Sequence, residues 1–359
     1  MTTFTVGKLF TGTNWLDNQA ISLESGVVKS ITPTKNSPTI DLLIPPFVDL
    51  QLYGAGGYLF SEHPTSQTLE IIHSHCLSAG TTYFMPTLAT NSIDVFCKGI
   101  KAVQDYWAQG GKGCIGLHLE GPWINPLKKG AHDSAYIHSP SLGEVKEVLK
   151  ISNGAVKMIT LAPEICTKEV IDCLVEHQIQ VSAGHSAANY EESINGFSKG
   201  IRCVTHLFNA MSPFQHRAPG LVGATLHDSQ AMASIIPDGH HVNWSVISIA
   251  HRLMGDRLFV ITDAVTDCNM GPYQHELKGD YYVANGVLSG SALTMLKAFN
   301  NLIQEVQLSV EDATKLCTVN PARAVGINNL LSPIQVGEKL QGISLNRKGK
   351  SFELIQVYD

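Results

Sequence analysis

Four polar residues of this 359-residue sequence have the types that metal-assisted hydrolysis requires. They are Glu120, His185, His206 and Asp263, and each stands at or near the end of a short apolar run. Two imidazoles and one carboxylate can bind a divalent metal such as zinc or iron, and three protein ligands leave one coordination position for water. The metal would lower the pKa of that water toward about 7. Asp263 could then accept the water's proton and deliver it to a leaving nitrogen.

Each of these residues also has an ordinary structural interpretation. A single histidine in an apolar run is more often a hydrogen-bonded core residue, and a carboxylate at a strand end often caps a helix. The metal site is favoured because all four residues fall at corresponding strand ends. The pair His73 and His75 is not counted, since it lies in a helical pattern in which residues two apart do not face each other.

Eight short apolar runs after residue 43 predict the strands that would position these residues. Most are rich in valine, isoleucine and threonine, and most end in a polar or glycine-rich turn. They are Ile44–Tyr53, Thr81–Leu88, Cys114–Gly121, Val156–Pro163, Ile179–His185, Cys203–Asn209, Met232–Gly239 and Arg257–Ala264. Helical patterns fill most gaps, whereas the glycines of Gly220–Asp228 predict an irregular segment. Eight strands alternating with helices indicate an α/β fold, a (β/α)8 TIM barrel, with its active site at the carboxyl ends of the strands.

Both ends of the chain differ from this barrel pattern. Residues 1–43 hold short alternating segments broken by glycine, asparagine and proline, and residues 326–359 hold two more such segments. We expect the two ends to meet in one small β-sandwich domain, with residues 44–325 forming the metallohydrolase barrel.

The bulk composition argues against several classes of protein. The net charge is −6, and the 25 basic and 31 acidic residues form no long runs, which argues against nucleic acid and an anionic membrane as partners. The first residues lack the pattern of a secretory signal, and no apolar stretch reaches the roughly 18–20 residues that span a bilayer. The eight cysteines form no CxxC pair, which favours a reduced, cytoplasmic setting.

Ordered motifs along nearly the whole chain resemble the N-acetylglucosamine-6-phosphate deacetylases of the amidohydrolase superfamily. The motifs are GLHLEGPW at 116–123, LAPE at 161–164, VSAGHS at 181–186, THLFNAM at 205–211, DGHHV at 238–242, TDA at 262–264 and LSGS at 288–291. Any one of them is weak, but the ordered set at the predicted strand ends is highly specific.

The resemblance implies a role for each candidate residue. It implies metal ligands at Glu120, His185 and His206, with Asp263 as general base and acid. It also implies substrate contacts from Ala131, His132, Asn209, Ala210, Arg217, His241, Leu288, Ser289 and Gly290. Arg217 suits the 6-phosphate, because a guanidinium can bind phosphate through two charge-assisted hydrogen bonds. The division of roles between His132 and His241 stays open.

One departure concerns the first predicted strand. Many amidohydrolases carry His-x-His there and hold a second metal, whereas this sequence has Gln51 and Tyr53, neither of which is a good zinc ligand. The sequence resembles the branch of the family with glutamine at that place, which implies one divalent metal per subunit, with zinc expected and iron as the alternative. Tyr53 is also bulkier than the expected residue and would narrow the pocket.

The resemblance implies that the chain hydrolyses the acetamide of N-acetyl-D-glucosamine 6-phosphate to glucosamine 6-phosphate and acetate, as a homodimer or higher homo-oligomer. The sequence discriminates poorly against the galactosamine epimer as substrate. A cyclic-amide hydrolase would usually need a modified lysine on the fourth strand, but Lys157 stands at the wrong end of that strand. A non-catalytic sugar-phosphate sensor would have lost a ligand or Asp263, and all four residues are present.

Overall fold

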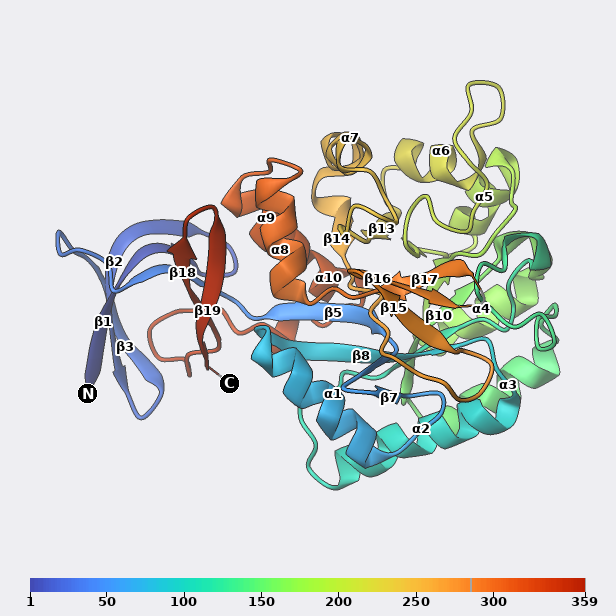
Figure 1. Ribbon diagram of the computed structural model, residues 1–359, viewed down its shortest axis with the longest axis horizontal. Coiled ribbons are helices and arrows are strands. Elements are labelled where there is room, and N and C mark those ends of the chain that lie inside the picture. Colours follow the sequence, from blue (N-terminus) through green and yellow to red (C-terminus); the bar gives the residue numbers. More distant parts are fainter. Residues whose placement is uncertain (285, 359) are drawn as a thin grey trace.

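The computed structural model describes residues 1–284 and 286–358 and shows a large barrel beside a smaller sheet that holds both termini (Figure 1). The barrel strands are β5 (Phe47–Leu52), β8 (Thr81–Ala89), β9 (Leu117–Glu120), β10 (Val156–Leu161), β11 (Gln180–Ala183), β12 (Cys203–Val204), β13 (Met232–Ile235) and β14 (Leu258–Val260). They pair in parallel in this order. A parallel bridge between Leu52 and Ala264 joins the first strand to the chain that leaves the last one, which closes the barrel. The predicted (β/α)8 barrel is confirmed.

Helices cover the outside of the barrel, and most begin at a residue that can cap them. They are α1 (Ser66–Ser78), α2 (Ile93–Ala108), α3 (Leu142–Ser152), α4 (Lys168–Glu176), α5 (Tyr190–Ser198), α6 (Gly220–His227), α7 (Trp244–Met254), α8 (Met295–Gln304), α9 (Val310–Cys317) and α10 (Val319–Ala324). Thr65, Ser92, Ser141 and Thr167 each accept a hydrogen bond from a backbone amide in the first turn of α1 to α4. Their apolar faces pack on the strands and bury one large continuous core.

The irregular segment predicted at Gly220–Asp228 is wrong, because Gly220–His227 form helix α6. Its glycines allow close packing. A Cβ atom on Gly223 would lie 2.3 Å from the side chain of Pro219 and 3.0 Å from the ring of Phe214. The contact that the missing side chain permits therefore outweighs the low helix propensity of glycine.

Three antiparallel strands that the sequence did not predict lie between β14 and α8. They are β15 (His275–Lys278), β16 (Tyr281–Ala284) and β17 (Val287–Ser291). In Figure 1 this small sheet is drawn in orange and crosses the middle of the view. A bridge between Ala264 and Ser291 attaches the end of β17 next to Asp263. The sheet thus carries residues 288–290 to the mouth of the barrel.

A six-stranded sheet contains both ends of the chain. Its strand order is β19 (Ser351–Tyr358), β18 (Gly342–Lys348), β4 (Ile40–Ile44), β1 (Thr2–Phe10), β2 (Trp15–Glu24) and β3 (Val27–Pro33). It has its own buried core, which includes Val6, Ile21 and Leu340. The small β-domain predicted from both ends is confirmed. Its division from the barrel at 43/44 and 325/326 remains our proposal, and Asp359 lies outside the described residues.

No helix in the described part of the chain is long and apolar enough to cross a membrane.

Candidate active site

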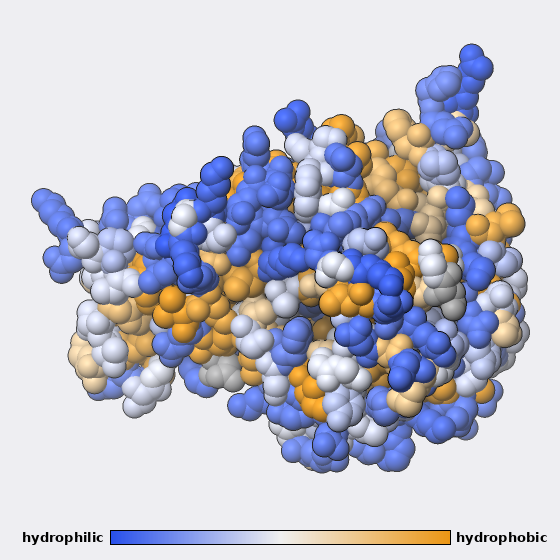
Figure 2. All heavy atoms as spheres, in the orientation of Figure 1, coloured by the Kyte–Doolittle hydropathy of each residue, from blue (hydrophilic) through white to orange (hydrophobic). Residues whose placement is uncertain are grey.

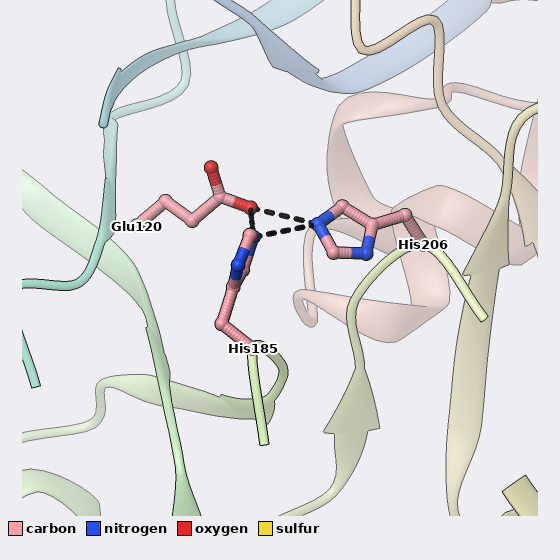
Figure 3. A group of neighbouring side chains, drawn as sticks. All are labelled: Glu120, His185 and His206. Carbon is pink, nitrogen blue, oxygen red and sulfur yellow. Dashed lines mark hydrogen bonds and ion pairs between the residues drawn. The ribbon is translucent and has the colours of Figure 1, made fainter. Parts of the chain in front are cut away.

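Glu120, His185 and His206 bring three potential ligand atoms together at the barrel mouth (Figure 3). Nε2 of His206 lies 3.0 Å from Oε1 of Glu120 and 3.1 Å from Nε2 of His185. Nε2 of His185 lies 3.3 Å from the same Glu120 oxygen. Ligand atoms placed 2.0–2.1 Å from a tetrahedral metal are about 3.3–3.4 Å apart. The triangle therefore has nearly the size that a divalent metal requires.

The backbone at the strand ends aims these side chains. Glu120 is the last residue of β9. His185 and His206 follow β11 and β12 with left-handed φ angles of 47° and 34°, and Asp263 follows β14 with a φ of 54°. Such angles are uncommon outside glycine, and they turn the chain sharply where each strand stops. The four predicted residues are consequently brought to one site.

Hydrogen bonds fix the imidazole of His185. Its Nδ1 donates to the carbonyl oxygen of Lys128 at 2.9 Å, so its Nε2 carries the lone pair. That lone pair faces Nε2 of His206, which also contacts Glu120. Burial by itself would raise the pKa of Glu120, but the imidazoles around it hold that pKa well below its usual value. A charged carboxylate and a facing imidazole lone pair fit a bound cation.

Gln51 and Tyr53 on the first barrel strand contact the same group of side chains. The amide nitrogen of Gln51 lies 3.0 Å from Oε1 of Glu120 and 2.8 Å from Oδ1 of Asp263. The hydroxyl of Tyr53 donates to Oε2 of Glu120. Burial, followed by the nearby carboxylates, raises the pKa of Tyr53 well above its usual value, so this phenol is neutral. Burial also raises the pKa of Asp263.

A cavity of about 370 Å³ lies next to this cluster and contains nearly all of the predicted substrate residues. Its lining includes Ala131, His132, Asn209, Ala210, His241, Leu288, Ser289 and Gly290, together with the three candidate ligands and Asp263. It also includes Tyr53, which the sequence predicted to narrow the pocket, and Lys128, Tyr273 and His275, which the sequence did not indicate as site residues. Tyr273 and His275 arrive with the unpredicted segment after β14, and no sequence signal identified them.

Arg217 is the one candidate that the structure places elsewhere. It is exposed and lines a different groove, together with Tyr190 and Pro219. Its neighbours Gln215 and Ala218 exchange backbone hydrogen bonds at the tip of a hairpin. This hairpin projects away from the barrel between α5 and α6, and it forms the hydrophilic projection at the top right of Figure 2. Within one chain, Arg217 therefore does not reach the cavity.

His132 and His241, whose roles the sequence did not distinguish, have different surroundings. Nδ1 of His132 accepts from the Thr90 amide at 3.3 Å, so the proton stays on Nε2, which points to Glu120 Oε2 at 3.2 Å. Burial lowers the pKa of His132 to about 4, so its ring is neutral at pH 7. Nδ1 of His241 lies 2.6 Å from Oδ2 of Asp238, which orients this ring in the lining of the cavity.

The carboxylate of Glu164, in the LAPE motif, fixes the loop that follows His185. It accepts hydrogen bonds from Ser186 Oγ at 2.7 Å and from the Ala187 amide at 2.7 Å. The side chain of Asn125 donates to it at 2.9 Å. Glu164 thereby joins the loop after His185 to the loop that begins at Asn125 and leads to His132.

Comparison with known proteins agrees with this geometry. The profile of the amidohydrolase family matches residues 42–340. The N-acetylglucosamine-6-phosphate deacetylase of Haemophilus influenzae is 32% identical over 349 residues, which cover 92% of this chain and 91% of that protein. The N-acetylgalactosamine-6-phosphate deacetylase of Escherichia coli O157:H7 is 28% identical over 354 residues, covering 94% and 93%.

A crystal structure of N-acetylglucosamine-6-phosphate deacetylase from Pasteurella multocida superimposes with a TM-score of 0.87 at 30% identity, covering 98% of this chain and 97% of that one. The match therefore extends over the barrel and the small sheet together. From the family profile and these relatives, the chain belongs to the amidohydrolase family, and its resemblance to the N-acetylglucosamine-6-phosphate deacetylases is confirmed.

Proposed function

We propose that this chain hydrolyses the acetamide of N-acetyl-D-glucosamine 6-phosphate, giving glucosamine 6-phosphate and acetate. The observation that carries the proposal is the arrangement of Glu120, His185 and His206 beside Asp263 in one cavity. Relatives that bear this activity in their names match the chain over nearly its whole length.

We propose that Glu120, His185 and His206 hold one divalent metal, with zinc expected and iron as the alternative. When bound, this ion would polarise the amide carbonyl and make water acidic enough to react at neutral pH. Gln51 and Tyr53 hydrogen-bond to Glu120, and Gln51 also to Asp263. They fill the place where histidines would hold a second metal, which supports a mononuclear site.

Two groups of this chain supply the proton chemistry and the polar support in the proposed mechanism. The carboxylate of Asp263 accepts the proton of the attacking water and then gives it to the departing amine nitrogen. The neutral ring of His132 carries its proton on Nε2. That N–H can move from Glu120 to the carbonyl oxygen of the substrate and stabilise the negative charge that develops there.

The polar part of the cavity would bind the sugar. Asn209, His241 and the segment 288–290 line it and can contact the hydroxyl groups. We propose that the chain works as a homo-oligomer, in which Arg217 of one subunit contacts the phosphate bound to a neighbouring subunit. The exposed hairpin that carries Arg217 away from its own cavity supports this arrangement.

Mixing two inactive variants tests the shared site. Arg217→Ala removes the phosphate contact and Asp263→Asn removes the base, so a hetero-oligomer of both regains some intact sites if Arg217 acts between subunits. Activity that does not recover after subunit exchange, with oligomers demonstrated by sedimentation, would contradict this arrangement.

The reaction itself is tested by acetate release. The substrates are N-acetylglucosamine 6-phosphate, its galactosamine epimer and the unphosphorylated sugar, with metal content measured on the same sample. Fast turnover of the first substrate with about one metal per chain is expected. A preference for the galactosamine epimer would leave the proposed reaction unchanged and replace the proposed substrate. Release of no acetate from any of the three sugars would contradict the proposal.

We also propose a cytoplasmic location, consistent with the free cysteines.

A further inference from the structure

An apolar group of side chains forms part of the cavity lining beside Glu120. Leu59, Ala89 and Tyr273 are buried and packed together, and Tyr53 packs against them. All four side chains also line the cavity. Ala89 on β8 is in register with Glu120 on β9, which places the two residues side by side at the mouth of the barrel. The apolar cluster therefore adjoins the proposed reaction centre.

The remainder of the cavity lining is mixed. Lys128, Asn209, His241 and Ser289 present polar groups to it, among apolar residues that include Ile236, Val265 and Leu288. Sugar hydroxyls and a phosphate need such groups, because burying them without hydrogen bonds or a charged partner is strongly unfavourable. In an N-acylated hexosamine phosphate, the alkyl part of the acyl group is the one substituent that gains from an apolar wall.

The geometry that the reaction requires places the alkyl part of the acyl group close to this apolar cluster. The carbonyl carbon has to lie next to Glu120, His185 and His206, with its nitrogen within reach of Asp263. The acyl alkyl group is bonded to this carbon, so it must occupy space beside the cluster. We propose that Leu59, Ala89, Tyr273 and Tyr53 form an acyl pocket, and that the ring of Tyr53 closes it so that acetyl is accepted and longer acyl groups are not. This inference rests on the proposed function.

Tyr53 is held in place, as a closing wall must be. Its hydroxyl donates to Glu120, and the Gln51 amide nitrogen lies 2.8 Å from it. Moving the ring aside for a longer acyl group would break the bond to Glu120 and leave a buried oxygen without its partner. Tyr273 is fixed as well, since its hydroxyl donates to the backbone carbonyl oxygen of Thr90. The pocket therefore cannot widen without losing hydrogen bonds.

The test compares kcat/KM for the N-acetyl, N-propionyl and N-butyryl derivatives of glucosamine 6-phosphate. One methylene too many in a closed pocket is expected to lower kcat/KM of the wild type by about 10–200-fold. Tyr53→Asn opens the pocket, so the acetyl-to-propionyl ratio should fall by about 10-fold or more. Tyr53→Phe is the matched control, because it keeps the ring and removes only the hydroxyl. It should retain the wild-type ratio even where turnover is lower.

Two further variants keep the test decisive if Tyr53→Asn binds no metal. Ala89→Gly enlarges the pocket and Ala89→Val reduces it, and neither removes a hydrogen bond from Glu120. They should shift the acyl ratio in opposite directions. An unchanged ratio in Tyr53→Asn or in both Ala89 variants would overturn the pocket, as would a ratio lost equally in Tyr53→Phe. Failure of the wild type to release acetate would instead contradict the proposed function.

Discussion

Asp49 is a buried carboxyl group where the barrel closes, and its replacement should remove part of the pH dependence of stability. Only 2% of Asp49 is exposed. It accepts hydrogen bonds from Thr262 Oγ1 at 2.5 Å and from the backbone amides of Thr262 at 3.2 Å and Gln51 at 3.3 Å. Burial raises the pKa of Asp49 from 3.8 to about 6, although these hydrogen bonds partly oppose the change.

This pKa sets both the sign and the size of the effect. The folded protein binds the proton of Asp49 more tightly than the unfolded chain does, so the free energy of unfolding falls as the proton is lost. The contribution is fully present below pH 3.8 and disappears as the pH rises through about 6. The whole change amounts to about 3 kcal/mol, of which about 1.4 kcal/mol falls between about pH 5 and pH 8.

Urea unfolding at those two pH values measures the effect. Asp49→Asn has no titrating carboxyl group, so its loss of unfolding free energy between pH 5 and pH 8 should be smaller than that of the wild type by about 1.4 kcal/mol. Asp17→Asn removes a negative charge from a side chain that is 71% exposed and serves as the control. An equal pH dependence in wild type and Asp49→Asn would refute the reasoning.

Three other variants probe the site itself. Asp263→Asn should retain its metal while turnover falls about 10²–10⁴-fold, the usual contribution of a general acid–base group; near-normal kcat would exclude that role. Combining Gln51→His with Tyr53→His should raise the metal content from about one to about two per chain, because imidazoles would replace groups that are poor ligands. A content that stays at one would show that these two residues do not block the second position. Glu164→Gln should weaken metal affinity by about 10-fold in competition with a chelating dye, whereas Glu144→Gln on the outer helix α3 should not.

The sequence predicted the barrel because its strands are continuous apolar runs. Parallel strands covered by helices are buried on both faces, and β5 is buried at every residue. The ends of the strands were less predictable. The runs continue past β11 and β12 to His185 and His206, since residues that enter the site are as buried as those in the sheet.

The small sheet β15 to β17 escaped prediction for a different reason. Its strands have four or five residues each, and most residues of β15 are exposed, so the strands show little of the apolar alternation that would identify them.

The position of Arg217 outside the cavity could not be predicted from the sequence either. A motif can indicate a phosphate-binding residue, but the direction in which its hairpin projects is a matter of tertiary structure that no local pattern encodes.

Three residues of the site have left-handed backbone angles that the surrounding fold has to maintain. His185, His206 and Asp263 all have φ between 30° and 60°, although a side chain in that region costs about 1–3 kcal/mol. Each is held by a hydrogen bond to a neighbouring strand or loop: the Asn125 amide donates to the carbonyl oxygen of His185, the His206 amide donates to Ser234 Oγ at 2.8 Å, and the Asp263 amide donates to the carbonyl oxygen of Gln51 at 2.9 Å. Glycine would relieve this strain but would carry no ligand or base. The barrel therefore maintains an unfavourable backbone conformation at the three strand ends where the chemistry needs histidine or aspartate. Such strain is expected where a site has been selected for catalysis at the expense of stability.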